Sequence, residues 1–131
     1  MSERGRTMID IKQFWKVVLD QDRAAIKKFF HEKAYVNWHC TNEHFTVDEF
    51  ILANCEYPGE WDGEVERVES MGNLLITATH VFSKDKTVSC HVISFFQIED
   101  QKIISVDEYW SDDGDAPSWR KEMHIGKPIN S

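Results

Sequence analysis

The sequence contains few cysteines. Only Cys40, Cys55 and Cys90 occur, and no two are spaced as CxxC. An odd number of cysteines without paired spacing argues against a disulfide framework. No apolar run approaches the roughly 18–20 residues that cross a bilayer, and the N-terminal stretch MSERGRTMID lacks the apolar core of a signal peptide. We therefore expect a protein of the reducing cytoplasm without a membrane-spanning segment.

Positive charge is also scarce. The chain has 15 Lys and Arg residues against 23 Asp and Glu residues, which gives a formal net charge of −8 at pH 7. No basic stripe interrupts this balance. Such a chain is repelled by phosphate backbones and by anionic lipid surfaces. The composition therefore predicts neither a nucleic acid nor a membrane as partner.

Metal-ligand spacing is missing as well. Six histidines are present, but no HxxxH or CxxC motif occurs. His39–Cys40 and Cys90–His91 are neighbours on predicted strands, where successive side chains point to opposite faces. The acidic run at residues 112–115 lacks the spacing and the closing Glu of an EF-hand. We predict no metal site and no cofactor.

The residues that are present suit one folded domain. A chain of 131 residues that is 41% hydrophobic and 29% charged fits a single hydrophobic core. Five Trp, three Tyr and eight Phe favour a substantial core or an aromatic-lined cavity. No internal repeat is visible. We assign residues 1–131 to one domain, with a polar N-terminal extension over residues 1–8.

Helical patterns occupy much of the first half. Residues 7–20 carry one apolar stripe at helical spacing, formed by Ile11, Phe14, Trp15, Val18 and Leu19. Residues 22–33 predict a short second helix. Residues 34–40 alternate as a strand. Residues 45–59 predict a third helix, because Thr46 and Glu49 are spaced as a capping box and a Pro-Gly pair ends the segment.

The second half has β character. Residues 63–70 are charged and predict an exposed edge strand. Residues 73–83, 87–99 and 102–110 are rich in β-branched and aromatic residues and are joined by short turns. Helices followed by a meander of strands indicate an α+β fold, with the helices packed on one face of a curved, mostly antiparallel sheet.

A carboxylate stands on an apolar face of the last strand. Ile104, Val106, Glu108 and Trp110 alternate onto one face. Burial disfavours the charged form of a carboxyl group and raises its pKa. A carboxyl in that state suits general acid–base catalysis near neutral pH.

The order of elements and several local strings resemble the nuclear transport factor 2-like superfamily, and its SnoaL-like, ketosteroid-isomerase-like branch in particular. The matching pieces are the amphipathic first helix, the string AYVNWHCTNEHFTVDEF and the strand ending DEYW, together spanning roughly residues 9–110. The resemblance implies a cone-shaped α+β barrel, in which a bent sheet encloses a pocket open at one end. Members are often homodimers that pair through the outer sheet face. They include isomerases, dehydratases, epoxide hydrolases, polyketide cyclases and binding-only proteins.

This fold places the polar residues of the apolar faces in a pocket. We predict that Glu108 is the catalytic acid or base and that His80 is its partner in a proton-transfer dyad, because His80 shares an apolar strand face with Leu74, Ile76, Ala78 and Phe82. The predicted substrate-binding walls are Trp15, Trp38, Cys40, Phe82, Phe96 and Trp110.

Each of these residues also has a purely structural explanation. Glu108 is also explained by an ion pair or solvent contact at the rim, and an isolated histidine on an apolar face is usually a core residue. Cys40 is better explained as a buried structural thiol than as a nucleophile. His91 is either a second polar group in the pocket or part of the dimer interface, and we favour the interface.

These residues and the resemblance together support two functions. The first is a cofactor-independent isomerase, cyclase or dehydratase acting on a small, largely apolar or polyketide-like compound. The second is a non-catalytic module that binds such a ligand. Steroid isomerisation is disfavoured, because the resemblance implies a catalytic aspartate in the region of residues 34–40, which contains no carboxylate. A protein-interaction role fits poorly, since no extra apolar patch is visible.

The C-terminal tail, residues 111–131, is turn-rich. Trp119, Met123, Ile125 and Pro128 are apolar anchors of the kind that ordered tails need. We predict that the tail folds back over the domain, near the pocket mouth or across a dimer partner. A disordered tail is the alternative.

Overall fold

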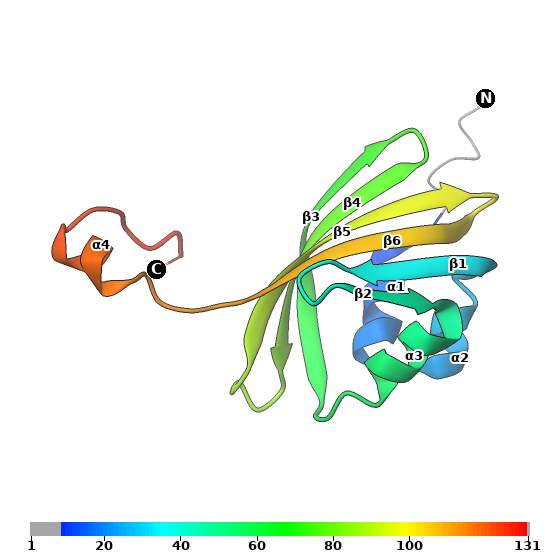
Figure 1. Ribbon diagram of the computed structural model, residues 1–131, viewed down its shortest axis with the longest axis horizontal. Coiled ribbons are helices and arrows are strands. Elements are labelled where there is room, and N and C mark those ends of the chain that lie inside the picture. Colours follow the sequence, from blue (N-terminus) through cyan, green and yellow to red (C-terminus); the bar gives the residue numbers. More distant parts are fainter. Residues whose placement is uncertain (1–8, 131) are drawn as a thin grey trace.

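The computed structural model describes residues 9–130, and Figure 1 shows the arrangement of its elements. The helices are α1 (Ile11–Leu19), α2 (Arg23–Lys27), α3 (Val47–Cys55) and α4 (Ser118–Glu122). The strands are β1 (Phe30–Trp38), β2 (Glu43–Thr46), β3 (Trp61–Met71), β4 (Leu74–Ser83), β5 (Ser89–Glu99) and β6 (Lys102–Asp112). Within this part of the chain, every helix is too short or too polar to span a membrane.

The strands form one curved sheet in the order β2-β1-β6-β5-β4-β3. Neighbouring strands run antiparallel except β1 and β6, which are parallel. Figure 1 shows α1, α2 and α3 gathered on one side of this sheet. The predicted α+β class, with helices covering one face of a curved and mostly antiparallel sheet, is confirmed. β3 is an edge strand, as its charged sequence predicts.

Helices α1 and α3 begin at residues that cap them. The side chain of Asp10 accepts a hydrogen bond from the backbone N–H of Gln13 at 3.1 Å. Thr46 and Glu49 make both hydrogen bonds of the predicted capping box. The residues that α1 buries are Ile11, Phe14, Trp15, Val17 and Val18. Most of the stability of so short a helix comes from packing this apolar face against the sheet.

The second helix is shorter than predicted. α2 ends at Lys27, and Phe30 begins β1, where it pairs with Ile103 of β6. Both of these side chains are buried in the core. Sheet pairing and burial outweigh the helical preference of such a short segment. The prediction of a helix over residues 22–33 is therefore wrong at its C-terminal end.

A bulge in β6 changes which side chains face the helices. The register between β5 and β6 shifts beside Ile104, which is the extra residue of the bulge. As a result Ile103 is fully buried and Ile104 is only half-buried, the reverse of the predicted faces. Beyond the bulge, Val106 and Glu108 are buried on the helix-facing side, as strand alternation predicts.

Gly63 of β3 lies where the backbones of two strands and a side chain of α1 approach closely. A Cβ atom at this position would stand 2.6 Å from the carbonyl oxygen of His80 and 2.9 Å from Cδ1 of Leu19. We expect Gly63→Ala to lower the free energy of unfolding by about 1–3 kcal/mol, because the strand pair must move apart. Urea denaturation followed by tryptophan fluorescence measures this loss.

The control for Gly63 is Gly114, where an added Cβ has open space around it. Gly114→Ala should leave the free energy of unfolding within about 0.5 kcal/mol of the original protein. Equal effects of the two substitutions would contradict the close approach at Gly63.

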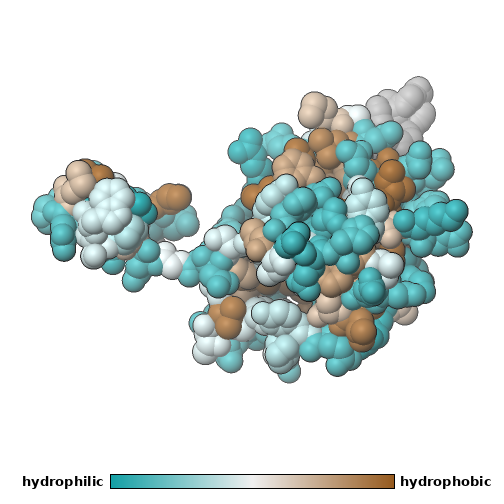
Figure 2. Space-filling view, in the orientation of Figure 1, coloured by the Kyte–Doolittle hydropathy of each residue, from teal (hydrophilic) through white to brown (hydrophobic). Residues whose placement is uncertain are grey.

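The C-terminal tail leaves the domain after β6. In Figures 1 and 2, α4 and its flanking residues form a lobe apart from the sheet. Trp119, Met123 and Ile125 are exposed. The predicted folding of the tail back over its own domain is therefore not seen in this structure. Packing across a partner chain stays a prediction.

Candidate functional site

A cavity of about 350 Å³ opens between α1, the end of α3 and the curved sheet. Its aromatic walls are Trp15, Trp38, Tyr57, Trp61 and Trp110. Polar groups also line it, among them Gln21, Cys40, Thr41, Asn54, Ser111 and Asp112. The cavity is large enough to hold a small organic molecule.

Four of the six predicted wall residues surround this cavity, namely Trp15, Trp38, Cys40 and Trp110. The other two do not, and their placement in the wall is wrong. Phe96 is fully buried in the core, with its ring centroid 5.5 Å from that of Phe14. Phe82 lies on the other face of the sheet beside His80. Strand alternation could not separate these cases, since both faces of β4 and β5 are rich in apolar residues.

Glu108 lies behind two of the wall tryptophans. Its Oε1 accepts hydrogen bonds from the indole N–H groups of Trp38 and Trp110, at 3.1 and 3.2 Å. Its Oε2 accepts a hydrogen bond from Oγ of Ser94 at 2.7 Å. The residue is 3% exposed and is not among the residues that surround the cavity. Both carboxyl oxygens are thus bound to the protein itself.

Burial raises the pKa of Glu108 above its usual value, and the three hydrogen bonds from Ser94, Trp110 and Trp38 oppose that rise. The direction agrees with the prediction made from the sequence. Its cause is removal of the carboxyl group from water. No cation compensates for this loss among the partners that the described residues provide.

The remaining wall tryptophans are also bound to protein oxygens. The indole N–H of Trp15 donates to Oγ1 of Thr77 at 3.2 Å, and that of Trp61 donates to the carbonyl oxygen of Pro58 at 3.1 Å. With Trp38 and Trp110 held by Glu108, all four indole N–H groups are used within the protein. The tryptophans therefore offer the cavity the carbon surface of their rings.

The cavity has an acidic character. Asp112 is the one charged residue among the described residues that surround it, and neither Lys nor Arg is in this set. Cys90 also lines the cavity, and burial together with the nearby Asp112 and Asp113 raises the pKa of its thiol to about 11. That thiol stays protonated at neutral pH. Cys40 is exposed, contrary to the prediction of a buried thiol.

His80 does not approach Glu108, and the predicted dyad is wrong. In β4 the buried side chains that face the helices are Leu75, Thr77, Thr79, Val81 and Ser83. His80 lies on the opposite, outer face and hydrogen-bonds Oγ of Ser89 through Nε2 at 2.8 Å. Glu108 faces the helices and pairs across the sheet with Ser94. The sheet therefore separates the two groups.

The outer face instead carries a cluster of polar side chains at His80. The imidazole rings of His80 and His91 are stacked, with centroids 4.6 Å apart. Nδ1 of His91 lies 2.5 Å from Oδ1 of Asp113, and Oγ of Ser89 donates to Oδ2 of the same carboxylate at 2.5 Å. Nε2 of His91 lies 3.4 Å from Oε1 of Glu66. We call Glu66, His80, Ser89, His91 and Asp113 the outer-face cluster.

Asp113 holds this cluster together electrostatically. Its hydrogen bonds to Ser89 and His91 lower the pKa of the carboxyl group despite partial burial, and the bond between Asp113 and His91 raises the pKa of His91. His91 thus lies outside the cavity, so the first of its two predicted places is wrong. Whether it contacts a partner chain stays a prediction.

Sequence reasoning missed several of these residues. Tyr57 and Trp61 complete the cavity wall, yet Tyr57 follows α3 and Trp61 begins β3, where no regular pattern marks a pocket. Glu66 belongs to the segment predicted as an exposed edge strand, and Asp113 belongs to the turn-rich tail. Their only visible signal was charge.

Comparison with solved structures identifies the fold. No protein-family model and no curated protein matches the sequence. A proposed ketosteroid isomerase from Kribbella flavida superposes with a TM-score of 0.76 at 16% identity, over 92% of this chain and 88% of that one. An NTF-2 like protein of unknown function from Burkholderia xenovorans gives 0.73 at 20% identity, over 90% and 91%.

A third structure was solved with a bound molecule. This hypothetical protein with a ketosteroid isomerase-like fold, from Catenulispora acidiphila, is in complex with trimethylamine. It superposes with a TM-score of 0.66 at 10% identity, over 78% of this chain and 85% of that one. Proposed SnoaL-like polyketide cyclases also share the fold. At these identities the comparisons show the predicted NTF2-like fold, and they do not select an activity.

The predicted homodimer stays a prediction. The outer face of the sheet offers exposed apolar side chains for such a contact, namely Tyr35, Ile93 and Tyr109 on β1, β5 and β6. On this face β5 and β6 pair Ile93 with Tyr109.

Proposed function

We propose that this chain, which has the nuclear transport factor 2-like fold, is a non-catalytic module that binds a small, largely apolar organic cation in its aromatic cavity. One observation carries the proposal: four tryptophans and a tyrosine surround a cavity whose only charged wall residue, within the described chain, is Asp112. Aromatic walls and a carboxylate are the groups that recognise a substituted ammonium ion.

The state of Glu108 supports binding over catalysis. A general acid or base must reach the proton that it transfers. Both oxygens of Glu108 are engaged by Trp38, Trp110 and Ser94, and the side chain is buried behind the wall. We infer that Glu108 positions the two tryptophans.

Electrostatics favour a cationic ligand over a neutral or anionic one. The chain carries a net charge of −8, and the cavity wall adds Asp112 without a compensating Lys or Arg among its described residues. A cation over an indole ring gains about 0.5–2 kcal/mol. The trimethylamine complex of the Catenulispora protein is consistent with an amine ligand in this fold.

The experiment compares three molecules of one shape and different charge. Choline, neutral 3,3-dimethylbutan-1-ol and anionic 3,3-dimethylbutanoate are titrated by isothermal calorimetry and by tryptophan fluorescence. We expect choline to bind at least about tenfold more tightly than the alcohol, which corresponds to about 1.4 kcal/mol, and the carboxylate to bind most weakly. Trp61→Leu should weaken choline binding by about tenfold, and Asp112→Asn by about threefold.

The matched control is Trp119→Leu, because Trp119 is an exposed tryptophan on α4 and does not line the cavity. Its choline affinity should equal that of the original protein. Equal or tighter binding of the neutral alcohol would overturn the cation preference. Binding of all three probes unaffected by Trp61→Leu would overturn the assignment of the cavity.

A second function, cofactor-independent acid–base catalysis, is favoured by one observation, the raised pKa of Glu108. In that case Glu108 is a general acid that becomes accessible when a ligand displaces Trp38 or Trp110. Glu108→Gln separates the two functions, since a binding module should keep its choline affinity within about threefold. An enzyme would lose turnover of its substrate.

A further inference from the structure

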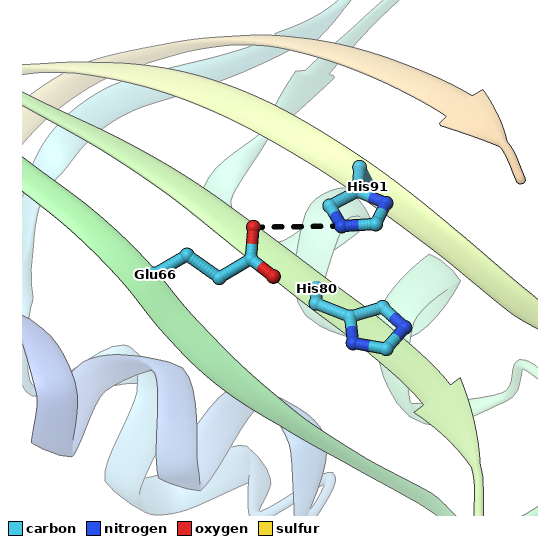
Figure 3. A group of neighbouring side chains, drawn as sticks. All are labelled: Glu66, His80 and His91. Atoms are coloured by element: carbon cyan, nitrogen blue, oxygen red, sulfur yellow. Dashed lines mark ion pairs between the residues drawn. The ribbon is translucent and has the colours of Figure 1, made fainter. Parts of the chain in front are cut away.

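Three side chains of the outer-face cluster converge from neighbouring strands, as Figure 3 shows. Glu66 is on β3, His80 on β4 and His91 on β5, and His80 and His91 are direct partners across the strand pair. One ligand atom from each residue lies within 4.8 Å of the others. The set is two imidazoles and one carboxylate, on the side of the sheet away from the aromatic cavity.

Glu66 lies on the outer face of β3, beside a break in the register between β3 and β4. The register between β3 and β4 shifts between Val65 and Arg67, so Glu66 is the extra residue. Bulges are over-represented beside functional sites. In Figure 3 the carboxylate of Glu66 points at the two imidazole rings.

Asp113 orients both imidazoles through their second nitrogen atoms. Its Oδ1 contacts Nδ1 of His91, which leaves Nε2 of that ring directed at Glu66. Its Oδ2 accepts from Ser89, whose hydroxyl bonds Nε2 of His80, and Nδ1 of His80 is then available. Metal-binding histidines in proteins commonly have a carboxylate partner on the second nitrogen, which fixes the tautomer and the ring.

We propose that Glu66, His80 and His91 bind a divalent transition-metal ion, Zn²⁺, with Asp113 as the positioning residue that orients both histidines. Two imidazoles and a carboxylate suit Zn²⁺ and leave a fourth position of its tetrahedron open. The side chains are 30–43% exposed, so the ion can reach them from solvent.

Binding requires a small rearrangement of exposed side chains. Ligand atoms around one tetrahedral Zn²⁺ at about 2.0–2.1 Å are roughly 3.3 Å apart. The ligand atoms of the three side chains in this structure lie within 4.8 Å of one another. The stacked rings must turn about their Cβ–Cγ bonds, because a metal lies close to the plane of each imidazole that it binds. The pair of His91 Nε2 and Glu66 Oε1 is already 3.4 Å apart, and the other ligand atoms have to close by at most about 1.5 Å, which surface rotamers allow.

The test is isothermal titration calorimetry of the full chain, without a histidine tag, with ZnCl₂. We expect one Zn²⁺ per chain with a Kd of about 10 µM or tighter. His80→Ala and His91→Ala should each weaken binding at least tenfold, and Asp113→Asn by about tenfold, as found for carboxylate partners of metal-binding histidines. Co²⁺ bound at the same site should show the visible absorption of a four-coordinate ion, and His91→Ala should remove it.

Two variants control for other Zn²⁺ ligands. Cys40→Ser removes an exposed thiol, and His44→Ala removes an exposed histidine outside the cluster, bonded to Asn37. Both should bind Zn²⁺ as the original protein does. Circular dichroism checks that each variant is folded. A Kd above about 100 µM, or equal losses for His44→Ala and His91→Ala, would overturn the proposal.

Discussion

Replacing Glu108 with alanine is expected to lower the free energy of unfolding by about 2–4 kcal/mol. Alanine leaves the indole N–H groups of Trp38 and Trp110 and the hydroxyl of Ser94 without their acceptor. Each buried donor without a partner costs about 1–3 kcal/mol. We place the total around the minimum of their sum, about 3 kcal/mol, because the two tryptophans border the cavity and can bond water there. Urea denaturation at pH 7 measures the loss.

Glutamine at position 108 is the matched control. Its carbonyl oxygen accepts from both tryptophans, and its amide donates to Ser94, as a protonated Glu would. We expect Glu108→Gln to change the free energy of unfolding at pH 7 by less than about 1 kcal/mol. Equal losses for Ala and Gln would mean that the hydrogen bonds to the two indoles contribute nothing.

The pH dependence of the free energy of unfolding, compared between the original protein and Glu108→Gln, checks the direction in which the Glu108 pKa is shifted. Because burial raises the pKa in the folded state, the stability that the protonated carboxyl contributes is fully present below its unfolded value of 4.5. That contribution is lost as pH rises through the folded pKa. The original protein should therefore lose stability relative to Glu108→Gln as pH increases from 4.5. Asp85, Asp107 and Asp113 have lowered pKa values and act in both proteins at lower pH, so they cancel in the difference.

The sequence predicted correctly those parts of the fold that depend on interactions between residues close together in the chain. The capping box of Thr46 and Glu49 marks the start of α3, and the apolar stripe of α1 marks a buried helix face. Alternation placed Glu108 on the buried face because the two faces of this part of β6 differ clearly in polarity. Val106 lies on the same face as Glu108, and Asp107 and Tyr109 lie on the other face. Each of these features is contained within a few consecutive residues.

The errors arose where the deciding interaction comes from elsewhere in the chain. Phe30 leaves its predicted helix because it pairs with Ile103, which lies far along the sequence. His80 was placed on the wrong face because β4 carries apolar residues on both faces, so alternation alone cannot tell inside from outside. The outer-face cluster brings together residues of β3, β4 and β5 and the residue that follows β6, and no local pattern in the sequence marks that meeting.

Replacing Phe14 with alanine should have the largest effect on stability, a loss of about 3–5 kcal/mol in the free energy of unfolding. Phe14 is 1% exposed, and its ring makes edge contacts with Phe29, Phe30 and Phe96 at centroid distances of 5.4–5.8 Å. It is the residue through which α1 holds the start of β1 and the middle of β5 together. Since small domains are stable by only about 5–15 kcal/mol, the variant should unfold at much lower urea concentration.

The control for this loss is Leu52→Ala, because Leu52 is a large apolar residue of α3 that is 53% exposed. Its removal leaves no buried cavity, so we expect a change within about 0.5 kcal/mol. Similar losses for Phe14→Ala and Leu52→Ala would contradict the packing of α1 in the concave face. Because α1 also supplies Trp15 to the cavity wall, loss of that packing would in addition weaken choline binding. Stability and ligand binding in this domain therefore depend on the same helix, through two neighbouring aromatic residues with different partners.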